Sequence, residues 1–188
     1  MPRSVVIFNP RSADAKHRIP NSIIQVAGSI HGKYNYHLVD GNLEVSPLEK
    51  ILDIIKENEV SCVGMTVMPG PQLKQAIPFS KEIKNRFPEI AIVWGGYFAS
   101  NQHEVVLNSG WVDLVVNGPG DEAFPRLLEF VPELNREDLK DIPNLIYLDD
   151  SGKIHKTRKE ALPDMDNMPP FPYTVSYTHL TLPTTSRV

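Results

Sequence analysis

The sequence contains a single cysteine and no long apolar run. With only Cys62 among 188 residues, the chain cannot form an internal disulfide or assemble a cysteine-based metal centre. No stretch approaches the roughly 20 apolar residues of a membrane span. The N-terminus enters an apolar strand pattern directly, without the hydrophobic core of a signal peptide. These absences predict a cytoplasmic protein.

Basic charge and the common phosphate-binding motifs are also missing. Lysine and arginine number 19 against 23 acids, which gives a net charge of −4 and argues against a nucleic-acid partner. No G-x-G-x-x-G follows the first strand pattern, and the chain has neither a Walker lysine motif nor a G-x-S-x-G elbow. The six histidines do not cluster at metal-ligand spacing. The sequence therefore predicts no catalytic residue and no metal ligand in this chain.

Short β-branched runs alternate with helical patterns. Strands are expected at 4–8, 36–39, 62–67, 90–94 and 112–116. Several of these runs are apolar throughout, as strands covered on both faces are. Helices are expected after Pro20, Ser46 and Asp121, and around a stripe in which Pro78 either delays or kinks the helix. The alternation predicts an α/β fold with a doubly wound, parallel, five-stranded sheet of the Rossmann-like or flavodoxin-like type.

The pattern changes after the fifth strand, which predicts three segments. Residues 1–132 are assigned to the sheet domain. Runs at 145–148 and 153–157 flank the turn sequence Asp-Asp-Ser-Gly and predict a C-terminal β-hairpin. A proline-rich stretch follows, so residues 133–174 are assigned to the hairpin and an extended linker. Residues 175–188 show neither a helical stripe nor a strand partner and form a separate tail.

The loops that follow the predicted strands indicate where a ligand could bind. In open α/β sheets, ligands bind outside the carboxyl ends of the strands, and glycine in such loops lets the main chain approach them closely. In the fifth loop, Asp121 and Glu122 would repel a phosphate and Pro119 removes an N–H donor. This favours a neutral or amide-bearing ligand group. The alternative is that the glycines only form tight turns.

Four segments together resemble, in order and spacing, the N-terminal half of radical SAM enzymes that carry a B12-binding domain. They are VGMTVMPGPQLKQA, IAIVWGGYFAS, WVDLVVNGPGDEAFPRLLE and LPDMDNMPPFPY, and the likeness covers about residues 4–173. The resemblance implies a cobalamin-binding Rossmann-like domain ahead of a radical SAM barrel. In the full-length protein, a Cys-x-x-x-Cys-x-x-Cys loop of that barrel would hold a [4Fe–4S] cluster with S-adenosylmethionine. Such enzymes catalyse methyl transfers or radical rearrangements.

We expect the cobalamin site to be lined by residues that follow the third, fourth and fifth predicted strands, at the edge where such sheets bind ligands. These are Thr66, Val67, Met68, Gly95, Gly96, Tyr97, Gly118 and Gly120. The chain departs from the family at Pro119, where the pattern has an acid. It also lacks the Asp-x-His-x-x-Gly signature of a protein ligand to cobalt, because the spacing from Asp14 to His17 is wrong. Cobalamin is therefore expected to bind without a protein histidine ligand.

The cluster-binding half of the family is missing from this chain. The sequence VSYTHLTLPT, at residues 175–184, matches a translated frame of a transposon-type sequencing adapter. Residues 175–188 are therefore expected to be non-native, attached to a fragment that stops before the barrel. With one cysteine, the fragment is expected to have no radical activity by itself. Its expected partners are cobalamin and the missing barrel in cis, with no nucleic acid and no membrane.

Two other hypotheses remain open from the sequence. The fold could be a non-enzymatic interaction scaffold that binds no cofactor. It could also be a stand-alone flavodoxin-like or nucleotide-binding enzyme, which the missing phosphate motifs disfavour. Binding of hydroxocobalamin separates the first interpretation from both alternatives.

Overall fold

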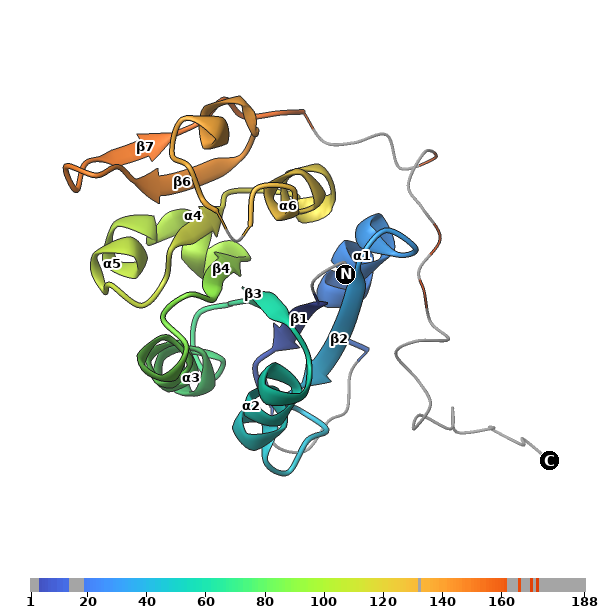
Figure 1. The fold of residues 1–188 in the computed structure, drawn as a ribbon. Helices are drawn as coiled ribbons and strands as arrows, with labels where there is room; N and C mark the ends of the chain where they lie inside the picture. The colour runs from blue at the N-terminus through green and yellow to red at the C-terminus, as the bar shows by residue number, and fades with distance from the viewer. Residues whose placement is uncertain are drawn as a thin grey trace.

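A single mixed sheet forms the centre of the molecule (Figure 1). The computed structural model describes residues 4–13, 19–131 and 133–161, together with residues 166, 170 and 172. The sheet has seven strands in the order β2-β1-β3-β4-β5-β6-β7. Their bounds are β1 Ser4–Asn9, β2 Asn35–Asp40, β3 Val60–Thr66, β4 Ala91–Gly95, β5 Leu114–Val116, β6 Leu145–Leu148 and β7 Ile154–Lys156.

The first five strands confirm the predicted doubly wound parallel arrangement. Strands β2, β1, β3, β4 and β5 pair in parallel, in the 2-1-3-4-5 order of flavodoxin-like sheets. The predicted hairpin is also present, but it does not stand apart from the sheet. Strand β6 pairs antiparallel with β5, and β7 pairs antiparallel with β6. The sheet therefore has seven strands where the sequence predicted five.

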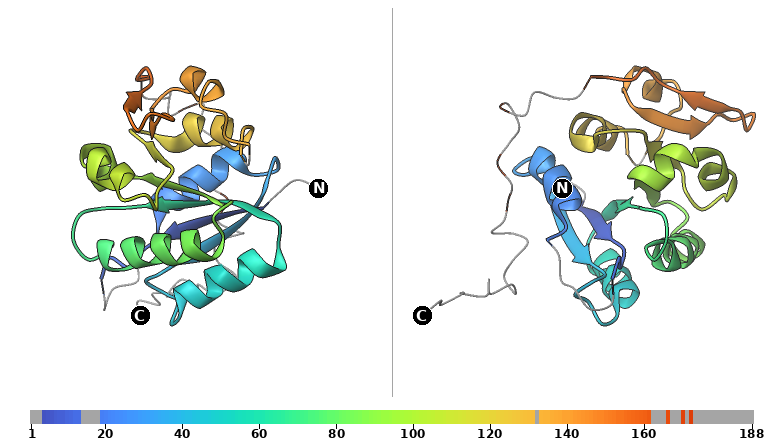
Figure 2. Two further views of the ribbon diagram at one scale, coloured as in Figure 1. Left: turned by 60° about the vertical axis from the view of Figure 1, so that its left-hand side comes forward. Right: turned by 180° about the vertical axis from the view of Figure 1, so that it is seen from behind.

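Helices cover both faces of the sheet. Their bounds are α1 Asn21–Ile30, α2 Pro47–Glu57, α3 Leu73–Arg86, α4 Tyr97–Asn101, α5 His103–Asn108 and α6 Gly120–Leu128, with a short 3₁₀ helix at Asp138–Asp141. Helices α1 and α6 pack on one face, whereas α2, α3, α4 and α5 pack on the other. The left-hand view in Figure 2 shows these two layers on either side of the strands. Among the described residues, no helix combines the length and apolar character that a bilayer crossing requires.

The alternation of side chains along each strand divides the core into two clusters. In β1, Val5 and Ile7 face α1 and α6, whereas Val6 and Phe8 face the opposite helices. All four are at most 3% exposed. A strand buried on both faces can use apolar residues at every position, which explains the continuous apolar runs in the sequence.

Helix α3 contains Pro78, a residue that was expected either to delay the start of the helix or to kink it. The helix begins at Leu73, before Pro78, so the expectation of a late start is wrong. A proline in the sixth position leaves the carbonyl of Lys74 without its N–H donor. Both Lys74 and Pro78 are exposed, so water can hydrate that carbonyl.

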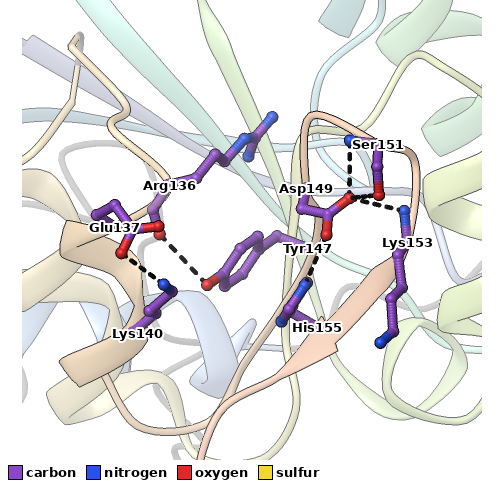
Figure 3. Close-up of polar contacts among 8 residues, drawn as sticks. All are labelled: Arg136, Glu137, Lys140, Tyr147, Asp149, Ser151, Lys153 and His155. Atoms are coloured by element: carbon purple, nitrogen blue, oxygen red, sulfur yellow. Dashed lines mark hydrogen bonds and ion pairs between the residues drawn. The ribbon is translucent and has the colours of Figure 1, made fainter.

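The β6–β7 hairpin is organised by the carboxylate of Asp149 (Figure 3). Its Oδ1 atom accepts hydrogen bonds from the Ser151 hydroxyl at 2.6 Å and from the backbone N–H groups of Ser151 and Lys153 at 2.9 Å. The His155 Nε2 atom lies 2.8 Å from the other oxygen, Oδ2. These hydrogen bonds, led by that of the Ser151 hydroxyl, lower the pKa of Asp149 well below its usual range. The ionised carboxylate therefore stabilises the turn.

We predict that Asp149→Asn lowers the melting temperature at pH 7. A depressed carboxyl pKa contributes stability above the pKa of the unfolded chain, and this contribution is lost as the pH falls through the folded pKa. The difference between the variant and the wild type should thus shrink below about pH 4, the ordinary range of an aspartate. Thermal melts across pH 3–7 measure this difference in melting temperature. Asp150→Asn, which removes the same charge from an exposed position in the same turn, should change little. Equal effects of the two substitutions would contradict the assignment.

Candidate functional site

A pocket opens at the carboxyl ends of the central strands. Its volume is about 320 Å³, and it is lined by residues of β1, β3, β4, β5, α1 and α6. In both Figure 1 and Figure 2, α1 and α6 lie on the same side of the sheet. The lining residues are Ile7, Ser22, Gln25, Val26, Gly64, Met65, Thr66, Val93, Gly95, Gly96, Val116, Gly118, Pro119, Gly120, Asp121 and Phe124. This is the edge at which doubly wound sheets bind ligands.

Glycine lets the sheet and its helices approach each other closely around the pocket. A Cβ atom at Gly64, in the middle of β3, would lie 3.1 Å from the Phe124 ring of α6. A Cβ atom at Gly120 would lie 3.2 Å from Cγ2 of Val26 on α1. Both separations are tighter than ordinary carbon–carbon contact. The aromatic ring therefore lies against bare backbone, in a mostly apolar pocket.

The loops after β3 and β4 are held together by backbone contacts. The N–H of Val67 donates to the Gly95 carbonyl at 2.8 Å, and the Val67 carbonyl accepts from the N–H of Phe98 at 3.0 Å. Gly96 has a φ of +88°, and a Cβ there would lie 2.9 Å from both the N and the O atom of Val67. Position 96 requires glycine both for its conformation and for its contacts.

A carboxylate and an amide contribute polar groups to the pocket. Gln25 of α1 donates from Nε2 to Oδ2 of Asp121, the second residue of α6, at 2.9 Å. Burial raises the pKa of Asp121 above its usual range, and the hydrogen bond from Gln25 opposes this only in part. Ser22 and Thr66 add hydroxyl groups to the lining. The pocket therefore presents hydrogen-bonding groups within an apolar surround, as small-molecule sites usually do.

A second polar network fixes the rim on the other side of the sheet. The buried side chain of Gln72 accepts from the Met68 N–H at 2.7 Å and donates to Oδ1 of Asn9 at 3.1 Å and to the Pro10 carbonyl at 2.9 Å. Asn9 in turn donates to Asp40 at 2.9 Å. The ends of β1 and β2 are thereby linked to the loop after β3.

The structure brings five of the eight predicted site residues together in this pocket. They are Thr66, Gly95, Gly96, Gly118 and Gly120. Val67 points into the opposite core and is fully buried, while Met68 and Tyr97 are 48% and 63% exposed outside the pocket lining. As ligand contacts, all eight remain predictions.

Sequence reasoning missed most of the helical side chains that line the pocket. Ser22, Gln25 and Val26 have the i, i+3, i+4 spacing of one helix face. Asp121 and Phe124 show the same i, i+3 relation. The strand residues Val93 and Gly64 could have been found from the period of two, because each precedes a predicted glycine or threonine by two positions.

Metal ligands are not gathered in the described part of the chain. No group of three or more His, Cys, Asp or Glu side chains comes together there, and no histidine is among the described residues of the pocket lining. His17 lies outside the described residues. Cys62 is fully buried, and burial raises the pKa of its thiol, so it is not a reactive nucleophile.

Comparison with known sequences identifies one matching family and a longer relative. The B12-binding domain family matches residues 16–128. The anaerobic magnesium-protoporphyrin IX monomethyl ester cyclase of Cereibacter sphaeroides is 24% identical over 141 residues, which span 74% of this chain and 23% of that protein.

Solved structures with the same fold cover most of the chain. The cobalamin-dependent S-adenosylmethionine radical enzyme OxsB, with aqua-cobalamin and S-adenosylmethionine bound, superposes with a TM-score of 0.71 at 15% identity. The match covers 86% of this chain and 23% of OxsB. The radical S-adenosylmethionine methyltransferase TsrM from Kitasatospora setae gives 0.69 at 18% identity, covering 83% of this chain and 30% of TsrM. The chain thus spans less than a third of each of these proteins.

We predict that Gly96→Ala destabilises the protein more than Gly70→Ala does. Both glycines have positive φ, +88° and +97°, so each substitution costs about 1–2 kcal/mol from the left-handed conformation. At position 70 the added methyl meets nothing within 4 Å, whereas at position 96 it overlaps the Val67 backbone. At position 96, overpacking therefore adds about 1–3 kcal/mol to the cost. Urea denaturation measures both variants, and equal losses would contradict the contact.

We predict that Asp121→Asn gives a melting temperature at pH 7 equal to or above that of the wild type. A raised carboxyl pKa means that the native state binds the proton more tightly than the unfolded chain, so stability is lost as the pH rises through the folded pKa. Asparagine removes this loss and keeps an oxygen that can accept from Gln25. Any gain should shrink as the pH approaches 4. A lower melting temperature at pH 7 would mean that the acid's favourable position at the helix N-terminus outweighs its desolvation.

Proposed function

This chain belongs to the B12-binding domain family, and we propose that its pocket at the carboxyl edge of the sheet holds the nucleotide arm of cobalamin. The resemblance found in the sequence is confirmed, and the chain is a cobalamin-binding module. The observation that carries the placement is the pocket itself, which lies between the strand ends and two helices and is mostly apolar.

The size and lining of the pocket suit the arm rather than the whole cofactor. A volume of about 320 Å³ lies at the lower end of the range for small-molecule sites. The corrin macrocycle with its side chains is larger than this, whereas a benzimidazole ring with its ribose is a compact, flat group. In this proposal the ring contacts apolar side chains, those of Ile7, Val93, Val116 and Phe124, and the bare backbone at Gly95 leaves room for it.

Residues of this pocket that held the nucleotide arm would keep its benzimidazole away from cobalt. That no protein histidine replaces it remains a prediction, which rests on the spacing of Asp14 and His17 in the sequence. When bound, cobalamin would supply organometallic chemistry at its cobalt. The part of the protein described here would bind the cofactor, orient it and exclude water from its arm.

We propose further that the module works within a longer radical SAM enzyme. The matched regions make up only 23% to 30% of the relatives named above, and both solved structures are of radical S-adenosylmethionine enzymes. In this proposal, residues 133–174 lead toward the barrel that would hold the [4Fe–4S] cluster and S-adenosylmethionine. Sequencing the parent locus past codon 174 tests it, because the proposal requires a Cys-x-x-x-Cys-x-x-Cys loop there.

We predict that hydroxocobalamin binds to this chain with a shift of its visible absorption band and that Gly95→Leu weakens binding at least tenfold. Gly95 lines the pocket and lacks a positive φ. Its added Cβ would meet only Val116, at 3.9 Å. The Gly95→Leu variant should therefore fold, and its leucine side chain should fill the space that the arm needs.

Gly95→Ala serves as the matched control, because one methyl group leaves most of the pocket open and should change affinity only a few-fold. Circular dichroism confirms that each variant is folded. Absence of a shift with folded wild type at high micromolar ligand would favour the scaffold hypothesis. Unchanged affinity of Gly95→Leu would place the cofactor elsewhere.

A further inference from the structure

The carboxylate of Asp121 is the one acidic group in the described lining of an otherwise mostly apolar pocket. It is half-buried, and its Oδ2 atom accepts from Gln25 at 2.9 Å. The next acid along α6, Glu122, is exposed and is not among the lining residues. Its Oε2 atom lies 3.7 Å from Nη2 of Arg126. Placing a carboxylate in such a pocket is unfavourable unless hydrogen bonds compensate for the lost hydration.

The amide of Gln25 compensates for this only in part. Burial remains the larger influence on Asp121, as the raised pKa of its carboxyl group shows. A carboxylate has about four acceptor positions, so a hydrogen bond from Gln25 leaves room for a donor from a ligand. A donor placed there would form a charge-assisted hydrogen bond, the strong kind in a partly dry site.

The charge of Asp121 also restricts which part of a ligand can lie beside it. The N-terminus of a helix normally attracts anions, but here Asp121 and Glu122 already occupy the first turn of α6. A phosphodiester placed next to them would be repelled. The favoured neighbour is a neutral group that carries an O–H or N–H donor.

We propose that Asp121, oriented by Gln25, accepts a hydrogen bond from a ribose hydroxyl of the cobalamin nucleotide arm and so selects for that arm. This inference rests on the proposed function, because it assumes that the arm occupies the pocket. Carboxylates at the carboxyl edge of dinucleotide-binding sheets recognise ribose hydroxyls through the same chemistry. In cobalamin, the ribose lies between the apolar base and the anionic phosphate. Its hydroxyls are therefore the donors next to a base held among apolar side chains.

Two ligands and three variants test this assignment. Hydroxocobalamin carries the complete arm, whereas cobinamide has the corrin ring and its amides but lacks the nucleotide. Affinities are measured by absorbance titration for the wild type, Asp121→Ala and Asp121→Asn. The control is Glu57→Gln, which removes a carboxylate from an exposed position on α2, on the opposite face of the sheet.

Asp121→Ala should weaken hydroxocobalamin binding about tenfold to a hundredfold, the range of a hydrogen bond to a charged group. Asp121→Asn should lie between alanine and the wild type, because its amide oxygen still accepts but carries no charge. Neither variant should change cobinamide affinity by more than about twofold. Glu57→Gln should resemble the wild type for both ligands.

Different failures have different meanings. Equal weakening for both ligands would place Asp121 against the corrin amides and overturn the ribose contact. Unchanged or tighter hydroxocobalamin binding by the Asp121 variants, with normal wild-type binding, would overturn the contact while leaving the proposed function intact. If the wild type binds cobinamide as tightly as hydroxocobalamin, the nucleotide arm does not occupy the pocket. If the wild type binds neither ligand, the proposed function and this inference fail together.

Discussion

The close backbone contact between two loops at the carboxyl edge of the sheet determines the form of the site. Val67 donates its N–H to the end of β4 and accepts through its carbonyl group from α4, and only glycine fits against it at position 96, between these two elements. Behind this contact, Gln72 ties the same loop to the end of β1, and Asn9 links that end to Asp40 of β2. The rim is thereby fixed on one side of the sheet, while on the other side α1 and α6 enclose the pocket.

The fold could be predicted largely from local patterns. Apolar runs of four to six residues predicted the parallel strands because a doubly covered strand is apolar on both faces. The helix expected after Asp121 is present as α6, and its apolar residues Phe124, Leu127 and Leu128 are buried. The attachment of the hairpin could not be predicted, because alternation identifies a strand but not the edge with which it pairs. The pairing of Val116 with Leu145 depends on tertiary packing that no local signal records.

The site was predictable only where the main chain itself forms it. Glycine after β4 and β5 indicated loops that approach a ligand, and those glycines line the pocket. Val67 was expected in the site with Thr66, yet adjacent residues of an extended chain face opposite sides, and the side chain of Val67 belongs to the other core. The lining residues of α1 could be found only by knowing that α1 and α6 lie on the same face of the sheet. That arrangement follows from the topology rather than from residue type.

The first turn of α6 gives this edge a polarity unlike that of nucleotide-binding sheets. In those sheets, a glycine-rich turn leaves the helix N–H groups free for a phosphate. Here the turn retains glycines at 118 and 120, but Pro119 lacks an N–H and two acids follow directly. The glycines therefore serve close packing, as the contact of Gly120 with Val26 shows, rather than anion binding. A fold shared with phosphate-binding proteins thus presents a surface that favours neutral groups, and that difference arises from only three side chains.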